Sequence, residues 1–204
     1  MTIADSYDAA ARAYAMHLAG ELAHKPLDRE LLERFGDQTR SGAVADLGCG
    51  PGHVARYLAD RGTHAIAIDL SPRMIDIARE LHPGLDARVG DMTALDLPDA
   101  SLAGAVLFYA IVHTAPEALS FRELRRVLVP GGLALVAFHV GTERVHVDDL
   151  FGVPVDLDFQ FHEPAVVAAA LARDGLPVIE HTVREPYPDV EYPSRRAYLL
   201  SRAR

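Results

Sequence analysis

The chain has 204 residues, of which 50% are hydrophobic and 24% are charged, and this length and composition predict one globular domain over residues 1–204. The formal net charge of −9 predicts an acidic surface, which repels phosphate backbones and excludes a broad nucleic-acid interface. No apolar run approaches the ~20 residues of a membrane-spanning helix, so we expect no membrane partner.

The chain is predicted to begin with a helical segment over residues 5–36, which Pro26 divides into two helices. Tyr7 and Tyr14 fall near one face of the first helix. Ordinary half-buried aromatics of an amphipathic helix are one interpretation of both residues.

A glycine loop follows a short apolar strand over residues 43–47. Gly48, Gly50 and Gly52 lead directly into a predicted helix over residues 52–61, and Asp46 precedes the first glycine. Glycines permit a close approach of a ligand to the backbone, and a helix N-terminus favours an anionic group. A tight strand-to-helix turn without a ligand explains the same residues. The dinucleotide pattern G-x-G-x-x-G is not met, because its third glycine position is His53.

Two further strands also end in acidic residues. The strand over residues 63–68 precedes Asp69, and the strand over residues 87–89 precedes Gly90 and Asp91. Between them a helix is predicted over residues 72–81, because Ser71 suits an N-cap and Pro72 the first helical position. Ligands of open parallel sheets bind at the carboxyl ends of the strands, so the glycine loop and the acids are expected to meet in one crevice.

These features resemble the class I S-adenosylmethionine-dependent methyltransferases that act on small molecules, most strongly over residues 44–138. The resemblance implies a Rossmann-like α/β fold with a seven-stranded, mostly parallel sheet, helices on both faces and an antiparallel C-terminal end. It also implies a helical lid over residues 1–40, with the two tyrosines across the cofactor mouth. The cofactor implied is S-adenosylmethionine, with S-adenosylhomocysteine as the product.

The resemblance also implies roles for individual residues. Asp69 would accept hydrogen bonds from the ribose diol, although a surface acid at a strand end is the alternative. Asp91 would accept from the adenine amino group, beside the backbone N–H of Met92. The cofactor contacts implied in full are Asp46, Gly48, Gly50, Gly52, Asp69, Leu70, Met74, Asp91, Met92, Tyr109, Tyr7 and Tyr14.

A continuous apolar run over residues 101–109 predicts the fourth strand, at the buried centre of the sheet. The Asn/Asp-Pro-Pro-aromatic motif of nucleic-acid amino methyltransferases is absent after it. Tyr109 is the candidate contact to the methionine moiety. His113 is the candidate general base, because an ordinary histidine pKa lets it take a proton near neutrality. A capping or surface histidine is the alternative.

The rest of the chain predicts a helix over residues 116–128, a strand over 133–140, a helix over 163–174 and two final strands over 178–184 and 197–201. Residues 141–163 form an inserted segment, with one amphipathic strand over 152–162 before the last helix. We expect this strand to set acceptor specificity, and a covering flap or a dimer contact is the alternative. His146 and Asp148 have no third ligand at a motif-like spacing, so we expect no metal.

The function predicted is methyl transfer from S-adenosylmethionine to an O, N or C atom of a small molecule. The alternatives are a nicotinamide-dependent oxidoreductase, and a cofactor-binding accessory protein or cyclase-like relative that transfers no methyl group. Cys49 is the single cysteine, which excludes an internal disulfide. The N-terminus lacks the basic and apolar regions of a signal peptide, so we expect a cytoplasmic monomer or homodimer.

Overall fold

Strands and helices alternate along most of the chain in a computed structural model that describes residues 1–204. The helices are α1 (Ile3–Leu18), α2 (Pro26–Gln38), α3 (His53–Ala59), α4 (Pro72–Leu81), α5 (Arg122–Val127) and α6 (Pro164–Arg173), with the 3-10 turns η1 (Glu21–His24), η2 (Ala110–His113) and η3 (Pro116–Ala118). The strands are β1 (Ala43–Leu47), β2 (His64–Asp69), β3 (Asp86–Val89), β4 (Leu102–Phe108), β5 (Leu128–His139), β6 (Arg144–Leu150), β7 (Val153–Gln160), β8 (Val178–Arg184) and β9 (Arg196–Arg202).

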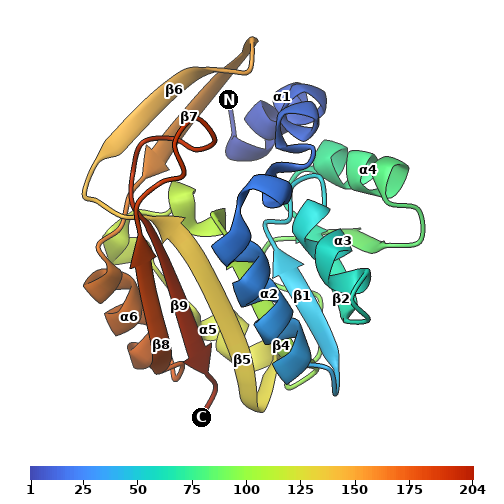
Figure 1. The fold of residues 1–204 in the computed structure, drawn as a ribbon, viewed down its shortest axis with the longest axis vertical. Helices are drawn as coiled ribbons and strands as arrows, with labels where there is room; N and C mark the ends of the chain where they lie inside the picture. The colour runs from blue at the N-terminus through green and yellow to red at the C-terminus, as the bar shows by residue number, and fades with distance from the viewer.

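Seven of the strands form one twisted sheet in the order β3-β2-β1-β4-β5-β9-β8 (Figure 1). The pairings from β3 through β5 are all parallel, whereas β9 pairs antiparallel with both β5 and β8. The strand order reverses between β1 and β4, which is where open α/β sheets place their ligands. The Rossmann-like fold with an antiparallel C-terminal end is thereby confirmed.

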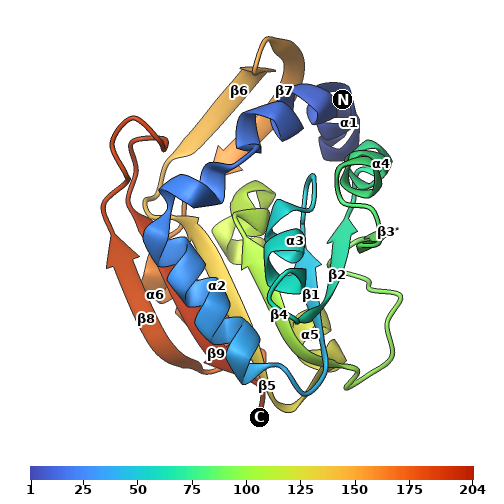
Figure 2. The same ribbon diagram turned by 45° about the vertical axis from the view of Figure 1, so that its right-hand side comes forward.

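Helices cover both faces of the sheet because its central strands are apolar on both sides. Val44 of β1 belongs to the core shared with α2, α3 and α4, while its neighbour Ala45 belongs to the core shared with α5 and α6. Figure 2 shows α2 and α3 in front of the strands. This packing fixes the carboxyl ends of β1, β2 and β4 at one edge of the molecule.

That edge is covered by α1 and by a hairpin of β6 and β7, which lie side by side in Figures 1 and 2. The hairpin is a separate two-stranded sheet. The predicted strand over residues 152–162 is therefore present as β7, and Val155 and Leu157 turn its buried face toward α1. Its partner β6 was not predicted, and His146 and Asp148 lie on this strand rather than at loop ends.

The predicted helix over residues 116–128 is wrong. Within these residues the chain forms the 3-10 turn η3 and then only the short helix α5. Strand β5 begins earlier than predicted, because Leu128 already pairs with Leu102 before a register shift near Gly131. The turn at Gly131, with φ of 80°, bends the strand without ending it.

Candidate active site

The glycine loop between β1 and α3 holds its shape through positive φ angles and backbone hydrogen bonds. Gly48 and Gly50 have φ of 70° and 53°, a conformation that residues with a Cβ rarely adopt. A Cβ on Gly48 would stand 2.7 Å from the Cβ of Ala110. The N–H groups of Gly48 and Cys49 donate to the carbonyl of Ile68 at 2.8 and 3.1 Å. The loop is thus fixed to the end of β2 with its backbone uncovered.

Gly52, unlike Gly48 and Gly50, lies at the contact between α3 and α4. It is the N-cap of α3, with φ of 80°, and it is buried. A Cβ there would approach Ala78 and Leu85 at 3.1 and 3.2 Å. Gly52 therefore allows α3 and α4 to pack closely, and it lines neither of the cavities described below.

Asp69 links the glycine loop to the start of α4. Its Oδ2 accepts from the N–H of Gly50 at 2.8 Å, and its Oδ1 accepts from the N–H of Ser71 at 2.9 Å. Burial raises the pKa of Asp69. The two hydrogen bonds favour the charged form and offset part of this rise. The two carboxylate oxygens are therefore held in fixed positions at the end of β2, with lone pairs left to accept from a ligand.

Asp46 lies beneath the loop and is almost fully buried, at 2% exposure. Its Oδ2 accepts from the N–H of Ala55 in the first turn of α3 at 3.0 Å. Burial raises the pKa of Asp46 to about 7, and the hydrogen bond and nearby His53 offset only part of this effect. Asp46 thus ties β1 to α3 below the loop.

A cavity of about 270 Å³ opens at the carboxyl ends of β1, β2, β3 and β4. Its lining residues are Ile3, Ala4, Tyr7, Tyr14, Gly48, Gly50, Asp69, Leu70, Ser71, Met74, Gly90, Asp91, Met92, Thr93, Phe108, Tyr109, Ala110, His113 and Thr114. Asp91 lies at the exposed end of this cavity, where its Oδ1 accepts from the N–H and the hydroxyl of Thr93, both at 2.7 Å. Most of the predicted site residues are thereby brought together.

A second cavity of about 250 Å³ adjoins the first on the other side of the glycine loop. The two cavities share the residues Tyr7, Tyr14, Gly48, Gly50, Phe108 and Tyr109. Asp46 contributes to the second cavity alone, together with aromatic and charged residues from the hairpin and the C-terminal part of the chain. The site therefore has two compartments that meet beside the shared aromatic rings and the loop backbone.

His113 and Tyr7 form a hydrogen-bonded pair at this meeting point. The Nδ1 of His113 lies 2.8 Å from the carbonyl oxygen of Asp158, which can only accept, so Nδ1 carries the proton. Nε2 therefore accepts from the hydroxyl of Tyr7 at 2.8 Å. Burial lowers the pKa of His113 and raises the pKa of Tyr7, so both groups are neutral near pH 7.

The cover formed by α1 and the hairpin is attached at several points. The hydroxyl of Ser6 lies 3.3 Å from the N–H of Asp156 on β7, which donates to it. The ring of Phe151 at the hairpin tip stacks on His17 of α1, with centroids 3.9 Å apart. On the opposite side, Oδ1 of Asp8 accepts from the N–H of Arg73 at 3.0 Å. Helix α1 thus lies over the cavities, whereas α2, which is part of the segment over residues 1–40 predicted as a lid, packs on the face of the sheet.

Comparison with known proteins agrees with this geometry. A family model described as "Methyltransferase domain" matches residues 44–132. The malonyl-[acyl-carrier protein] O-methyltransferase of Erwinia billingiae is 29% identical over 191 residues, which are 92% of this chain and 74% of that enzyme. The trans-aconitate 2-methyltransferase of Mycobacterium ulcerans is 44% identical over 91 residues, which are 43% of this chain and 32% of that enzyme. Three further methyltransferases are matched over 41–48% of their own length.

Solved structures give the same fold. An S-adenosylmethionine-dependent methyltransferase from Methanosarcina mazei superposes with a TM-score of 0.70 and 17% identity, covering 79% of this chain and 92% of that one. The chain is therefore similar to class I methyltransferases, in sequence over residues 44–132 and in fold. The matched segment contains the glycine loop, Asp69 and Asp91, whereas α1 and the hairpin of β6 and β7 lie outside it.

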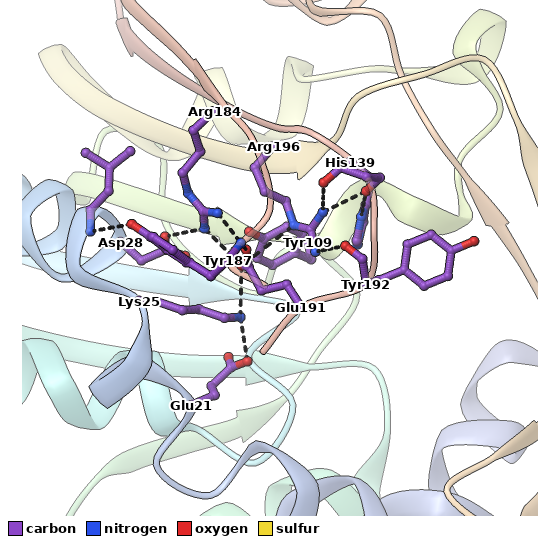
Figure 3. A network of polar contacts seen from close by, with 12 residues as sticks. Glu21, Lys25, Asp28, Tyr109, His139, Arg184, Tyr187, Glu191, Tyr192 and Arg196 are labelled. Atoms are coloured by element: carbon purple, nitrogen blue, oxygen red, sulfur yellow. Dashed lines mark hydrogen bonds and ion pairs between the residues drawn. The ribbon is translucent and has the colours of Figure 1, made fainter. Parts of the chain in front are cut away.

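A network of buried charges, shown in Figure 3, lies beside the second cavity. Arg184 donates to Asp28 at 2.9 Å and to Glu191 at 2.6 Å, and the hydroxyl of Tyr198 donates to Asp28 at 2.7 Å. Burial would raise the pKa of Glu191, but Arg184 and the N–H of Tyr187 lower it to about 2. The network joins α2 to the end strands β8 and β9.

Its outer part reaches the glycine loop. Lys25 pairs with Glu21 at 2.6 Å and lies 3.6 Å from Glu191, and Nε2 of His53 lies 2.8 Å from Glu21. Burial would raise the pKa of Glu21, but His53 and Lys25 lower it to about 2. All four residues line the second cavity, and none was predicted from the sequence, because they come from distant parts of the chain without a shared motif.

No group of three or more His, Cys, Asp or Glu side chains in the structure is arranged to hold a metal ion. His146 instead lies 3.3 Å from the carboxylate of Asp158 on the facing strand of the hairpin. None of the helices has both the length and the apolar character needed to cross a bilayer.

Proposed function

We propose that this protein transfers the methyl group of S-adenosylmethionine to an O, N or C atom of a small molecule. The observation that carries the proposal is the junction of the two cavities. One holds the glycine loop with Asp69 and Asp91, the other is lined by aromatic and charged groups, and both open onto Tyr7 and Tyr109. The cofactor would occupy the first compartment and the loop, and the acceptor would enter the second.

The residues present fit this cofactor. The oxygens of Asp69 are fixed by two backbone N–H groups and keep lone pairs for a ribose diol. The uncovered backbone at Gly48 and Gly50 would admit a methionine tail, and a Cβ on Gly48 would displace the loop because it would clash with Ala110. Asp91 and Met92 line the end of the cavity suited to an adenine, and Leu70 and Met74 provide apolar walls. The bound cofactor would supply a sulfonium whose methyl group is already activated for displacement.

The chain itself would contribute alignment and a route for one proton. Because the donor is activated, catalysis rests mainly on placing the acceptor in line with the methyl group. An acceptor hydroxyl or amine beside Tyr7 could pass its proton to the Tyr7 oxygen while the Tyr7 proton moves to Nε2 of His113. In this scheme Tyr7 touches the acceptor, and His113 acts as the base through Tyr7.

One related enzyme is named for a small acceptor, and another for a small acyl group carried on a protein. The relatives named above are a malonyl-[acyl-carrier protein] O-methyltransferase and a trans-aconitate 2-methyltransferase. The net negative charge and the second cavity of about 250 Å³ agree with a small molecule in place of nucleic acid.

The first test is calorimetric titration with S-adenosylmethionine, S-adenosylhomocysteine, NADH and NADPH. Binding of the two adenosyl sulfur compounds alone supports the proposal, and binding of a nicotinamide alone would replace it with an oxidoreductase. Asp69→Asn should weaken S-adenosylhomocysteine binding about tenfold or more, since a charged acceptor is lost and the new NH₂ group faces a backbone N–H. Asp96→Asn, in an exposed loop, is the matched control.

A second test separates methyl transfer from binding alone. Once an acceptor is found, His113→Phe should retain cofactor affinity but lower kcat, and the loss should be smaller for acceptors that bind as anions. Tyr7→Phe should behave in the same way, because it interrupts the same proton route. Binding without turnover on any acceptor would favour the alternative of an accessory or cyclase-like protein.

A further inference from the structure

His139, at the end of β5, is a polar group of the second cavity that the scheme above does not use. Its ring is held on three sides by aromatic residues. It stacks on Phe161 with centroids 5.0 Å apart and an interplanar angle of 15°, and it contacts Tyr109 and Tyr192 at centroid distances of 5.1 and 6.1 Å. Figure 3 shows His139 close to Arg196 and Tyr192. The orientation of the imidazole is therefore fixed.

The hydrogen bonds around Ser194 determine which nitrogen of His139 carries the proton. Arg196 donates from Nη1 to the hydroxyl oxygen of Ser194 at 2.6 Å. The same oxygen lies 2.8 Å from Nδ1 of His139. Arg196 can only donate to this oxygen, and Nδ1 is the acceptor nearest to the Ser194 hydroxyl proton, so we infer that the hydroxyl donates to Nδ1. The proton of the neutral imidazole is then on Nε2, which has no hydrogen-bond partner within the protein.

Charges near His139 favour an anion at this nitrogen. Burial, Arg196 and Lys25 lower the pKa of His139 to about 3, while Glu191 acts in the opposite direction, so the ring stays neutral. Arg196 is 3% exposed, and its Nε lies 3.8 Å from Glu191 without forming a hydrogen bond. By contrast, Asp46 and Asp69 lie on the side of the glycine loop. Arg196 and Lys25, although they also lie near Glu191, are the cations of the second cavity, and they favour an anionic ligand on the side of His139 over the side of the loop.

We propose that His139 anchors the methyl acceptor by donating from Nε2 to a carboxylate, so that the acceptors are small organic acids with a flat apolar body. The flat body is favoured because the cavity walls include the rings of Tyr109, Phe159 and Tyr192. Ser194 is a positioning residue that holds the donor tautomer of His139. This inference rests on the proposed function, because it assigns the substrate class of the same site.

The inference is tested by calorimetric titration with matched acids and amides. Benzoate and phenylacetate are the acids, and benzamide and phenylacetamide are their neutral counterparts. With the protein saturated by S-adenosylhomocysteine, each acid should bind about tenfold more tightly than its amide. His139→Leu should remove this difference, whereas His139→Gln, which keeps an N–H donor, should retain most of it. His181→Leu, on the exposed face of β8, is the control.

The role of Ser194 has its own readout. Ser194→Ala should reduce the ratio of acid to amide affinity, and Ser194→Thr, which restores the hydroxyl, should restore the ratio. A merely structural role would change both affinities together and leave the ratio unaltered.

Equal binding of acids and amides, unchanged acid binding in His139→Leu, or no binding of either acid would overturn the inference. Each titration is repeated without S-adenosylhomocysteine. A protein that binds no adenosyl compound but still prefers acids through His139 would refute the proposed function and leave the anchor intact. A protein that binds the adenosyl compounds but shows no preference for acids would refute the anchor alone.

Discussion

Replacing Asp46 with asparagine should change how the stability of this protein depends on pH. Burial raises the pKa of Asp46 from 3.8 to about 7. Between these two values the folded protein keeps a proton that the unfolded chain has released, so the native state binds more protons. The stability that this proton confers is complete below about pH 4 and is lost as the pH rises to 7. An asparagine side chain does not titrate, so the substitution removes this loss.

The expected magnitude follows from the shift. At about 1.4 kcal/mol per pKa unit, the contribution of Asp46 to the free energy of unfolding falls by about 2–3 kcal/mol as the pH rises from 5 to 8. Asparagine keeps an oxygen that can accept the 3.0 Å hydrogen bond from Ala55, so the fold is preserved. His139 acts in the opposite direction, because its lowered pKa makes the unfolded chain bind more protons below pH 6.5. That effect is common to both proteins and cancels in their difference.

The measurement is urea unfolding of the wild type and Asp46→Asn at unit steps from pH 5 to pH 8. The variant should gain stability over the wild type as the pH rises, and most of the gain should be present by pH 7. Asp96→Asn, in which the replaced side chain is exposed, should show the same pH dependence of the free energy of unfolding as the wild type. A difference between Asp46→Asn and the wild type that stays constant within about 0.5 kcal/mol would refute the assignment of a raised pKa to Asp46.

Two further substitutions test the loop and its cover. Gly48→Ala should abolish S-adenosylhomocysteine binding in calorimetry, because a Cβ at φ of 70° would press on Ala110, whereas Gly62→Ala, at φ of 86° with open space around it, should bind normally. Phe151→Ala should speed ligand release in stopped-flow measurements, because it removes the stack on His17. An unchanged release rate would mean that the hairpin tip does not restrict the exit.

The elements that carry the glycine loop were predictable because each has a local signature. Helix α4 was predicted over its observed length, since Ser71 caps it and Pro72 starts it. The strand ends that carry Asp46 and Asp69 were predictable from short apolar runs followed by an acid. Parallel strands share one edge, so the convergence of these acids followed from the order of the elements.

The second cavity could not be predicted in the same way. Strand β6 reads as a polar segment, because only Val145, Val147 and Leu150 turn toward the covered side of the hairpin. Its pairing with β7 becomes apparent only once both strands lie over α1. The charge network was missed because Lys25 and Glu191 are distant in sequence, and charged residues are normally assigned to the surface. Non-local contacts therefore determine the compartment that would choose the acceptor.

His113 and His139 have different proposed chemical roles in the site because they have different hydrogen-bond partners. The carbonyl beside His113 leaves its free nitrogen as an acceptor, while the Ser194 hydroxyl beside His139 leaves its free nitrogen as a donor. Burial lowers both pKa values, so neither ring becomes a cation near pH 7. A cationic imidazole would repel a sulfonium in the adjoining compartment. Keeping both rings neutral allows one to accept a proton and the other to hold the acceptor without opposing the proposed cofactor.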